Sequence, residues 1–280
     1  MEATVIAFSN LKGGVGKTTT ANAFGAGLKR RGYKVLCIDM DPQGNLSSSV
    51  NASIDDESPT ILEVMKRKVG VKEAIQHCLP FDIIPSDVML SGYEMELIAT
   101  QFGRDTKLSR AIEPVKNEYD FILIDTAPAL GMLTINALMA SDEVIAPSFA
   151  EFFSVSGIEL LIDTIRNVRA SSNSPKLKLD GILMTQLNPR ILNGKAVVKA
   201  TNEYLEHISK PEVNELGDTL EPIHTKMYTT FIRKGVAMAE SQTMRQDIFT
   251  YDPASTVASD YSDFIDEYLT EHGKELCVNA

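Results

Sequence analysis

A short glycine-rich segment limits most strongly what this chain can fold into. Residues Leu11–Thr18 read LKGGVGKT, which fits the phosphate-loop pattern GxxxxGK[ST] except that Leu11 replaces the opening glycine. The segment follows the apolar run Thr4–Ser9 and precedes Thr18–Arg31, which suits a helix ending at Gly32. A strand, a glycine-rich turn and a helix in this order let backbone N–H groups surround a phosphate at the helix N-terminus. The start of the chain therefore predicts a phosphate-binding loop.

Apolar runs of the same kind recur along the chain and alternate with helical patterns. The runs are continuously apolar, which is typical of parallel strands covered on both faces. The expected strands are Thr4–Ser9, Lys34–Asp41, Phe81–Ser86, Asp120–Pro128, Glu143–Phe149 and Lys178–Gln186. The expected helices between them are Ile61–Arg67, Lys107–Lys116, Leu133–Ala140 and Gly157–Arg169. This alternation predicts an α/β fold, a doubly wound and mostly parallel sheet flanked by helices.

The domain organisation is expected to be simple. The sequence contains no repeat, no low-complexity tract and no long linker, so we expect one domain over residues 1–280. Pro175 and its neighbouring serines indicate a surface loop, and an acidic helix is expected around Ser262–His272. We expect no helix-turn-helix domain before the first strand, which begins near Thr4.

Carboxylates follow two of the expected strands at the edge where ligands bind in such sheets. Lys17 is placed to reach the β- and γ-phosphates of a nucleotide, and the Thr18 hydroxyl is placed to hold Mg²⁺. Asp125 ends an apolar run and is expected to reach the same ion, directly or through water. Asp39 and Asp41 end the second run, and either could orient an attacking water. A turn or helix-capping role is the alternative for each aspartate.

Lys12 is a second lysine at the mouth of the loop. A second cation on the same phosphates in cis would crowd Lys17. A side chain that leaves the loop could instead stabilise the γ-phosphate of a nucleotide held by another subunit. An exposed, solvated lysine is the alternative that the residues alone leave open.

Four segments together resemble one family. They are KGGVGKTTT at 12–20, VLCIDMDPQGN at 35–45, FILIDTAPALGMLTINAL at 121–138 and YDPAS at 251–255. In these segments and their order, the chain resembles the ParA/Soj family of deviant Walker A ATPases, within the wider MinD-like group. The resemblance runs from about Ile6 to about Leu269. It implies a P-loop ATPase that binds ATP and Mg²⁺ between two subunits.

The resemblance also implies roles for single residues. Lys12 would be the signature lysine that crosses to the partner's phosphates. Asp41 would assist the attack of water and Asp125 would be the Walker B aspartate. The remaining ATP-binding positions would be Gly13, Gly14, Val15, Gly16, Lys17, Thr18 and Thr19, with Thr18 and Asp125 at the metal.

A partition cycle is the activity that the resemblance implies. The ATP-bound homodimer would bind duplex DNA non-specifically, and a ParB-like adaptor would stimulate a slow hydrolysis that releases it. The cycle would segregate plasmid or chromosomal DNA, from a cytoplasmic, nucleoid-associated location. Close relatives carry a proline before the arginine where this chain has Ile232 and Arg233, and another arginine at Ala237. The DNA-binding candidates are Arg190, Lys195, Lys199, Arg233 and Lys234.

Charge and cysteine content bear on three other functions: nucleic-acid binding, membrane binding and an iron–sulfur protein. The formal net charge is −11, which disfavours nucleic-acid binding in general, but residues 164–200 form a basic island with a single acidic residue, Asp180. The acidic C-terminal segment argues against the basic membrane helix of MinD-like proteins, so no membrane partner is expected. Cys37, Cys78 and Cys277 form no metal-binding pattern, which excludes a nitrogenase-type iron protein and fits reduced thiols.

Two further functions remain as alternatives. A ParA-like ATPase could position a protein cargo or serve a conjugative element, and the sequence does not separate this from DNA partition. A scaffold that binds nucleotide without hydrolysing it is disfavoured, because Asp41 and Asp125 are both present.

Overall fold

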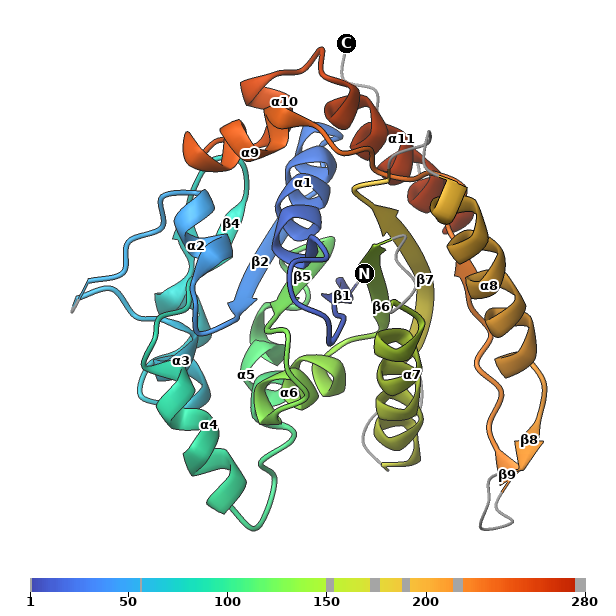
Figure 1. Cartoon of the computed structure of the whole chain (residues 1–280). Helices are drawn as coiled ribbons and strands as arrows, with labels where there is room; N and C mark the ends of the chain where they lie inside the picture. The colour runs from blue at the N-terminus through green and yellow to red at the C-terminus, as the bar shows by residue number, and fades with distance from the viewer. Residues whose placement is uncertain are drawn as a thin grey trace.

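A single sheet of eight strands organises the molecule (Figure 1). The computed structural model describes residues 2–55, 57–149, 154–171, 177–187, 192–213 and 219–274. The strands are hydrogen-bonded in the order β10-β7-β6-β1-β5-β2-β4-β3. Their bounds are β1 Thr4–Phe8, β2 Val35–Met40, β3 Gln76–His77, β4 Asp82–Ile84, β5 Phe121–Thr126, β6 Glu143–Phe149, β7 Lys178–Thr185 and β10 Lys226–Met227.

Within the described residues, every strand pair of this sheet is parallel except β3 with β4. A separate antiparallel pair is formed by β8 (Glu212–Val213) and β9 (Thr219–Leu220). The expected doubly wound, mostly parallel α/β fold is therefore confirmed, and each of the six expected strands is present at its place.

Helices cover both faces of the sheet, as the continuously apolar strands require. They are α1 Lys17–Arg30, α2 Asn45–Ser49, α3 Ile61–Met65, α4 Leu90–Ala99, α5 Lys107–Ile112, α6 Met132–Ala140, α7 Ser154–Ala170, α8 Leu192–Ile208, α9 Val236–Thr243, α10 Ile248–Tyr251 and α11 Thr256–Glu271, with 3₁₀ turns η1 Val71–Ala74 and η2 Glu113–Val115. No helix in the described part of the chain is long and apolar enough to cross a bilayer.

Alternate residues of one strand pack on opposite faces, which is the period of two expected of a strand. On β1, Ile6 and Phe8 join a core with α1 and α11, where Phe24 packs edge-on against Phe8 and Tyr268. Val5 faces the other side and joins a core with α3 to α6. A third cluster packs α7 and α8 against β6 and β7.

Two of the expected helices differ most in extent from the structure, while α3 ends at Met65 instead of Arg67 and α7 begins at Ser154 instead of Gly157. The segment Lys107–Lys116 was expected as one helix, but α5 ends at Ile112 and η2 follows, because Pro114 has no N–H to donate within a helix. The C-terminal helix begins at Thr256 rather than near Ser262, where the Ser255 hydroxyl accepts a hydrogen bond from the Ala258 N–H at 3.2 Å. The expected loop at Pro175 lies outside the described residues.

A candidate nucleotide site at the carboxyl edge of the sheet

The glycine-rich loop joins β1 to α1 with its backbone turned to the left-handed region at two glycines. Gly14 has φ +75° and Gly16 has φ +89°, conformations that favour glycine. The hydroxyl of Thr185, at the end of β7, donates to the Val15 carbonyl at 2.8 Å and fixes the loop to the sheet. A chain held in this way presents N–H groups at the start of α1, which can receive an anion.

Lys17 is buried at the base of the loop. Its Nζ donates to the Lys12 carbonyl at 3.2 Å, so the loop closes on its own lysine. Burial lowers the pKa of Lys17, while the charges of Asp125 and Asp41 act in the opposite direction. Desolvation strengthens the attraction of the lysine for a phosphate, and the two carboxylates favour its charged form.

Asp125 is the most unusual group of the site. It is fully buried, and neither of its carboxylate oxygens has a hydrogen-bond partner among the described residues. Burial raises the pKa of Asp125 well above its usual range, and the nearby charge of Asp39 raises it further. The Thr18 hydroxyl lowers this pKa, although it forms no hydrogen bond of ordinary geometry with the carboxylate.

An orphaned buried carboxylate beside a threonine hydroxyl has the donor chemistry that Mg²⁺ prefers. Without a cation, the desolvation of this group destabilises its charged form. Thr18 and Asp125 therefore fit the metal-binding pair expected from the sequence.

Asp39 and Asp41 have different surroundings. Asp39 is fully buried opposite Asp125 on the neighbouring strand. It accepts hydrogen bonds from the Ser47 N–H at 2.9 Å, the Ser47 hydroxyl at 2.7 Å and the Asp41 N–H at 3.1 Å. Burial raises the pKa of Asp39 to about 6, against these hydrogen bonds. Asp41 instead borders the cavity and accepts from the Gln43 N–H at 3.0 Å. Asp39 thus anchors the segment that carries Asp41.

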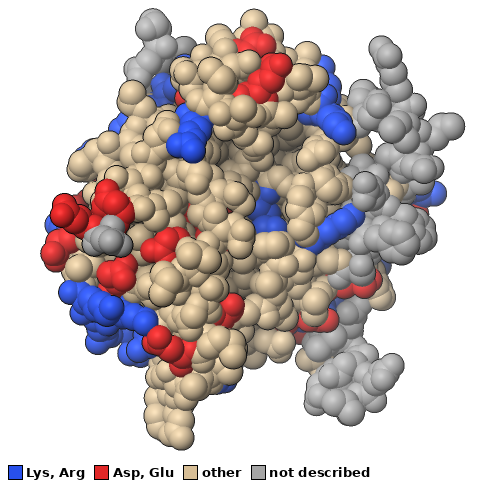
Figure 2. Space-filling model, turned by 60° about the vertical axis from the view of Figure 1, so that its left-hand side comes forward, with Lys and Arg blue, Asp and Glu red and all other residues tan. Residues whose placement is uncertain are grey.

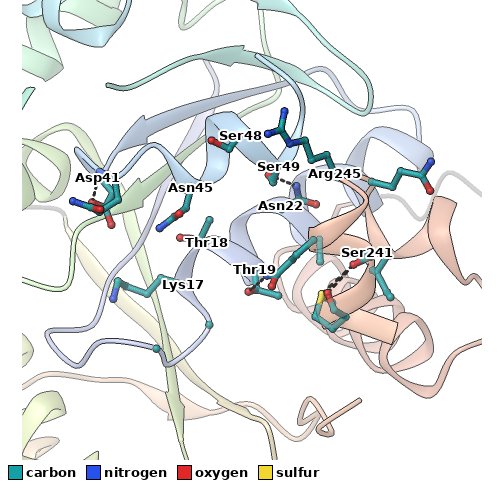
Figure 3. A pocket seen from close by; sticks show the side chains of 18 of the residues that line it. Lys17, Thr18, Thr19, Asn22, Asp41, Asn45, Ser48, Ser49, Ser241 and Arg245 are labelled. Carbon is teal, nitrogen blue, oxygen red and sulfur yellow. Dashed lines mark hydrogen bonds between the residues drawn. The ribbon is translucent and has the colours of Figure 1, made fainter. Parts of the chain in front are cut away.

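A cavity of about 570 Å³ opens above the loop (Figure 3). Lys17, Thr18 and Asp41 lie on one side of the view, and Ser241 and Arg245 lie on the other. The lining residues are Gly14, Gly16, Lys17, Thr18, Thr19, Asn22, Ala23, Asp41, Gln43, Asn45, Ser48, Ser49, Pro128, Gln186, Met238, Ser241, Gln242, Arg245, Gln246 and Ile248. The cavity is large enough for a small-molecule ligand and is built from the phosphate loop, α2 and the α9–α10 segment.

The α9–α10 wall is the part of the site that the sequence analysis missed. Gln242 Nε2, on α9, donates to the Thr19 hydroxyl at 2.7 Å. Elsewhere in the site, Asn22 Nδ2 of α1 donates to the Ser49 hydroxyl of α2 at 2.8 Å. A neighbouring cavity of about 170 Å³ shares Gly16, Thr19 and Gln242 with the larger one. No motif distinguishes these polar residues in the sequence, because it is the fold that brings α9 against the first turn of α1.

Lys12 does not line either cavity. Its ammonium lies 5.5 Å from the centroid of the Phe149 ring, and its N–H donates to Asn10 Oδ1 at 3.0 Å. Figure 2 shows basic atoms on the floor of a hollow near the middle of one face, with acidic side chains gathered to one side. The Lys12 side chain therefore lies against Phe149 and does not border the cavity of its own loop.

The DNA-binding candidates are described unequally. Arg190 lies outside the described residues, and Lys195 lies on α8 without a described side chain. Lys199 is 79% exposed and lies 3.6 Å from Glu203. Arg233 forms an ion pair with Asp260, in which Nε lies 2.9 Å from Oδ2 and Nη2 lies 2.6 Å from Oδ1. Lys234 is exposed and its N–H donates to the Leu187 carbonyl at 3.4 Å.

Known proteins are similar to this chain in sequence and in fold. A family model described as "AAA domain" matches residues 3–179. The chain is 36% identical to the sporulation initiation inhibitor protein Soj of Bacillus subtilis over 265 residues, which cover 94% of this chain and 97% of the relative. It is 35% identical to the chromosome partitioning protein ParA of Caulobacter vibrioides over 252 residues, covering 89% and 87% respectively.

Solved structures agree on the architecture. The cobyrinic acid a,c-diamide synthase of Mycobacterium smegmatis with bound ADP and magnesium superposes with a TM-score of 0.76 at 27% identity, over 98% of each chain. An ATP complex of a variant of Cyanothece McdA superposes with a TM-score of 0.80 at 20% identity, also over 98% of each chain, and shows likeness of fold alone.

Proposed function

Because the chain belongs to the ParA/Soj family of P-loop ATPases, we propose that it hydrolyses ATP within a dimer that forms in the ATP state. In that state it binds duplex DNA non-specifically, and a ParB-like adaptor stimulates an otherwise slow hydrolysis. The cycle segregates plasmid or chromosomal DNA on the nucleoid. The chain acts as one domain over residues 1–280.

The observation that carries this proposal is the orphaned carboxylate of Asp125 beside Lys17 and Thr18. A buried carboxylate without a hydrogen-bond partner is costly unless a ligand supplies one. Thr18 and Asp125 would hold Mg²⁺, which supplies positive charge to the β- and γ-phosphates when bound. The related synthase structure was solved with ADP and magnesium, which supports both ligands here.

The chain's own residues bind the phosphates and orient the attacking water. The N–H groups of residues 13–19 and the Lys17 ammonium bind the phosphates and orient the γ-phosphate. Asp41 orients a water whose oxygen attacks the γ-phosphorus. The bond from that phosphorus to the β–γ bridging oxygen breaks, and its electron pair stays on ADP. One hydrogen of the water stays on the new P–OH group, and the other passes as a proton to a phosphate oxygen.

Lys12 acts across the dimer. Its side chain lies against Phe149 rather than in the cavity of its own subunit, as a role toward the nucleotide of the facing subunit requires. There its ammonium stabilises the charge that develops on the γ-phosphate.

The test is binding of the purified protein to arbitrary duplex DNA with Mg²⁺ and ATP, ADP or no nucleotide. Asp41→Ala serves as the trapped ATP state and Lys12→Ala as the variant deficient in dimerisation. Binding only with ATP, stronger in Asp41→Ala and lost in Lys12→Ala, is the expected result. Equal binding in all three nucleotide conditions would contradict the proposed cycle.

One observation favours a second function. The Arg233 guanidinium is occupied by Asp260, and Ala237 stands where the resemblance implies an arginine, so this part of the DNA surface is weakened. A ParA-like ATPase that positions a protein cargo needs no such surface. Dimerisation with ATP but no DNA binding would favour this second function.

A further inference from the structure

The hydroxyl of Ser47 is a buried polar group outside the phosphate loop. Ser47 lies in α2 and is fully buried, whereas its neighbours Ser48 and Ser49 line the large cavity. Its hydroxyl donates to Asp39 Oδ2 at 2.7 Å and accepts a hydrogen bond from the Ser86 N–H at 3.0 Å. The hydroxyl therefore joins the end of β2, the helix α2 and the chain that follows β4.

Asp39 extends this connection to Asp41. One oxygen of the Asp39 carboxylate, Oδ2, accepts from both the hydroxyl and the N–H of Ser47, at 2.7 Å and 2.9 Å. The other oxygen, Oδ1, accepts from the Asp41 N–H at 3.1 Å. Hydrogen bonds to both oxygens limit the rotation of a carboxylate, and they are stronger when the acceptor is charged. The orientation of Asp39 therefore helps to set the position of the Asp41 backbone.

The turn after Asp41 is packed against the same contact. The Gly44 N–H donates to the Asp41 carbonyl at 2.9 Å, and the Gln43 N–H donates to Asp41 Oδ1 at 3.0 Å. Gly44 has φ +61°, and a Cβ there would lie 3.0 Å from the Ser86 carbonyl oxygen. The backbone of Ser86 thus contacts the turn through its carbonyl and Ser47 through its N–H. A change at Ser47 is therefore expected to move the Asp41 side chain.

The phosphates are bound by a different segment in the proposed function, residues 13–19 with the Lys17 ammonium. Figure 3 shows Asp41 on the same side of the cavity as Lys17. Ser47 is hydrogen-bonded to Asp39, which precedes Asp41 on the neighbouring segment of chain. Loss of the Ser47 hydroxyl should therefore misalign Asp41 and leave the affinity for ATP nearly unchanged.

A buried serine elsewhere in the fold offers a matched comparison. Ser141 is 5% exposed and follows α6, and its hydroxyl donates to the Ala137 carbonyl at 2.7 Å. Removing either serine hydroxyl leaves a buried acceptor with one donor fewer. Of the two hydroxyls, only that of Ser47 is bonded to the carboxylate that holds the Asp41 N–H.

We propose that Ser47 is a positioning residue for hydrolysis. Its hydroxyl holds the Asp39 carboxylate, and Asp39 holds Asp41 in the orientation that directs the Asp41 carboxylate toward the attacking water. Misplacing a group that orients a reactant lowers the rate even where binding is intact. This inference rests on the proposed function, in which Asp41 orients that water.

The test measures phosphate release from Mg²⁺–ATP by wild type, Ser47→Ala, Ser47→Thr and Ser141→Ala, and measures ATP affinity separately with a fluorescent ATP analogue. We expect Ser47→Ala to lower kcat about tenfold, with KM and the dissociation constant within about twofold of wild type. Ser47→Thr keeps a hydroxyl and should retain kcat within about twofold of wild type. Ser141→Ala should match wild type in all three quantities.

Urea unfolding of each variant checks that it is folded under the conditions of the assay. If Ser47→Ala does not fold, Ser47→Cys takes its place, because a thiol is similar in size and only a weak hydrogen-bond donor. Its kcat should then be lower than that of Ser47→Thr, again without a loss of affinity.

Four outcomes would overturn the inference. They are an unchanged kcat in Ser47→Ala, a kcat in Ser47→Thr as low as in Ser47→Ala, an equal loss of ATP affinity and kcat, and a kcat in Ser141→Ala as low as in Ser47→Ala. The second would mean that packing and not the hydroxyl matters, and the third that the hydroxyl supports the whole site. Absence of phosphate release from wild type would instead contradict the proposed function itself.

Discussion

The two buried carboxylates at the strand ends, Asp39 and Asp125, differ in the number of hydrogen bonds that they accept. Asp39 accepts three hydrogen bonds from Ser47 and Asp41, whereas neither oxygen of Asp125 has a partner among the described residues. Both groups are fully buried and lie opposite each other on β2 and β5. Asp39 on β2 therefore has a structural role, whereas Asp125 on β5 remains able to bind a ligand.

Asp125→Asn should separate the stability of the free protein from its affinity for Mg²⁺ and ATP. The raised pKa of Asp125 means that its charged form destabilises the folded state above the unfolded pKa, so the variant should be more stable at pH 7 without ligand, by about 1 kcal/mol. Its hydrolysis rate should fall about a hundredfold. Urea unfolding and phosphate release measure the two effects.

The control for this prediction is the stabilisation that Mg²⁺ and ATP give to wild type, which the variant should lack. A variant that is less stable without ligand and is stabilised as much as wild type would show that Asp125 is not the metal ligand.

At the scale of elements, α11 is fixed to the sheet at its last turn. His272 follows the helix, and its Nε2 lies 3.0 Å from Asp180 Oδ1 and 3.3 Å from Glu143 Oε1. The Tyr268 hydroxyl donates to the other oxygen of Glu143 at 2.7 Å. A cation at a helix C-terminus is also favoured by the helix dipole. The group thus joins α11 to β6 and β7.

His272→Gln should destabilise the protein in a pH-dependent way. Hydrogen bonds to Asp180 and Glu143 raise the pKa of His272 to about 10, above its unfolded value near 6.5. The stabilisation is therefore complete below about pH 6.5 and fades as the pH rises toward 10. We expect a loss of about 2 kcal/mol at pH 6 that shrinks with rising pH, measured by urea unfolding at each pH.

A matched control is His77→Gln, because His77 lies 2.9 Å from Asp82 but is 81% exposed. Exposed ion pairs contribute little, so this variant should stay close to wild type at every pH. A pH-independent loss in His272→Gln would mean that the side chain acts by packing alone.

At the scale of the whole molecule, an acidic chain has to present its positive charge locally if it binds DNA. Arg190→Ala and Lys199→Ala should each weaken DNA binding in the ATP state and lower the slope of log affinity against log salt by about 1. Filter binding over a salt series measures both quantities. The expected contrast is Arg233→Ala, which removes the ion pair with Asp260 and should mainly lower stability.

If Arg190→Ala and Lys199→Ala leave the affinity and its salt slope unchanged, the basic island is only a solvated surface. The exposed Lys199–Glu203 pair would then be an ordinary helix-surface contact.

The sequence alone determined the layered fold and the phosphate loop. Both depend on local patterns: apolar runs that end in aspartates, and glycines at positions that need positive φ, as at Gly14 and Gly16. The sequence did not predict α4, α8 or α9. Helices α4 and α9 show little apolar periodicity, so a pattern search does not find them, whereas α8 has a clear amphipathic period that was overlooked.

Only the tertiary structure decided which side chains complete the site. Gln242 and Arg245 reach the cavity because α9 packs against the first turn of α1, a contact between residues more than two hundred positions apart. It also decided that Asp39 has hydrogen-bond partners while Asp125 has none among the described residues. It likewise decided that Arg233 forms an ion pair with Asp260. Local sequence encodes backbone shape, whereas desolvation and pairing of charges depend on neighbours that only the folded chain supplies.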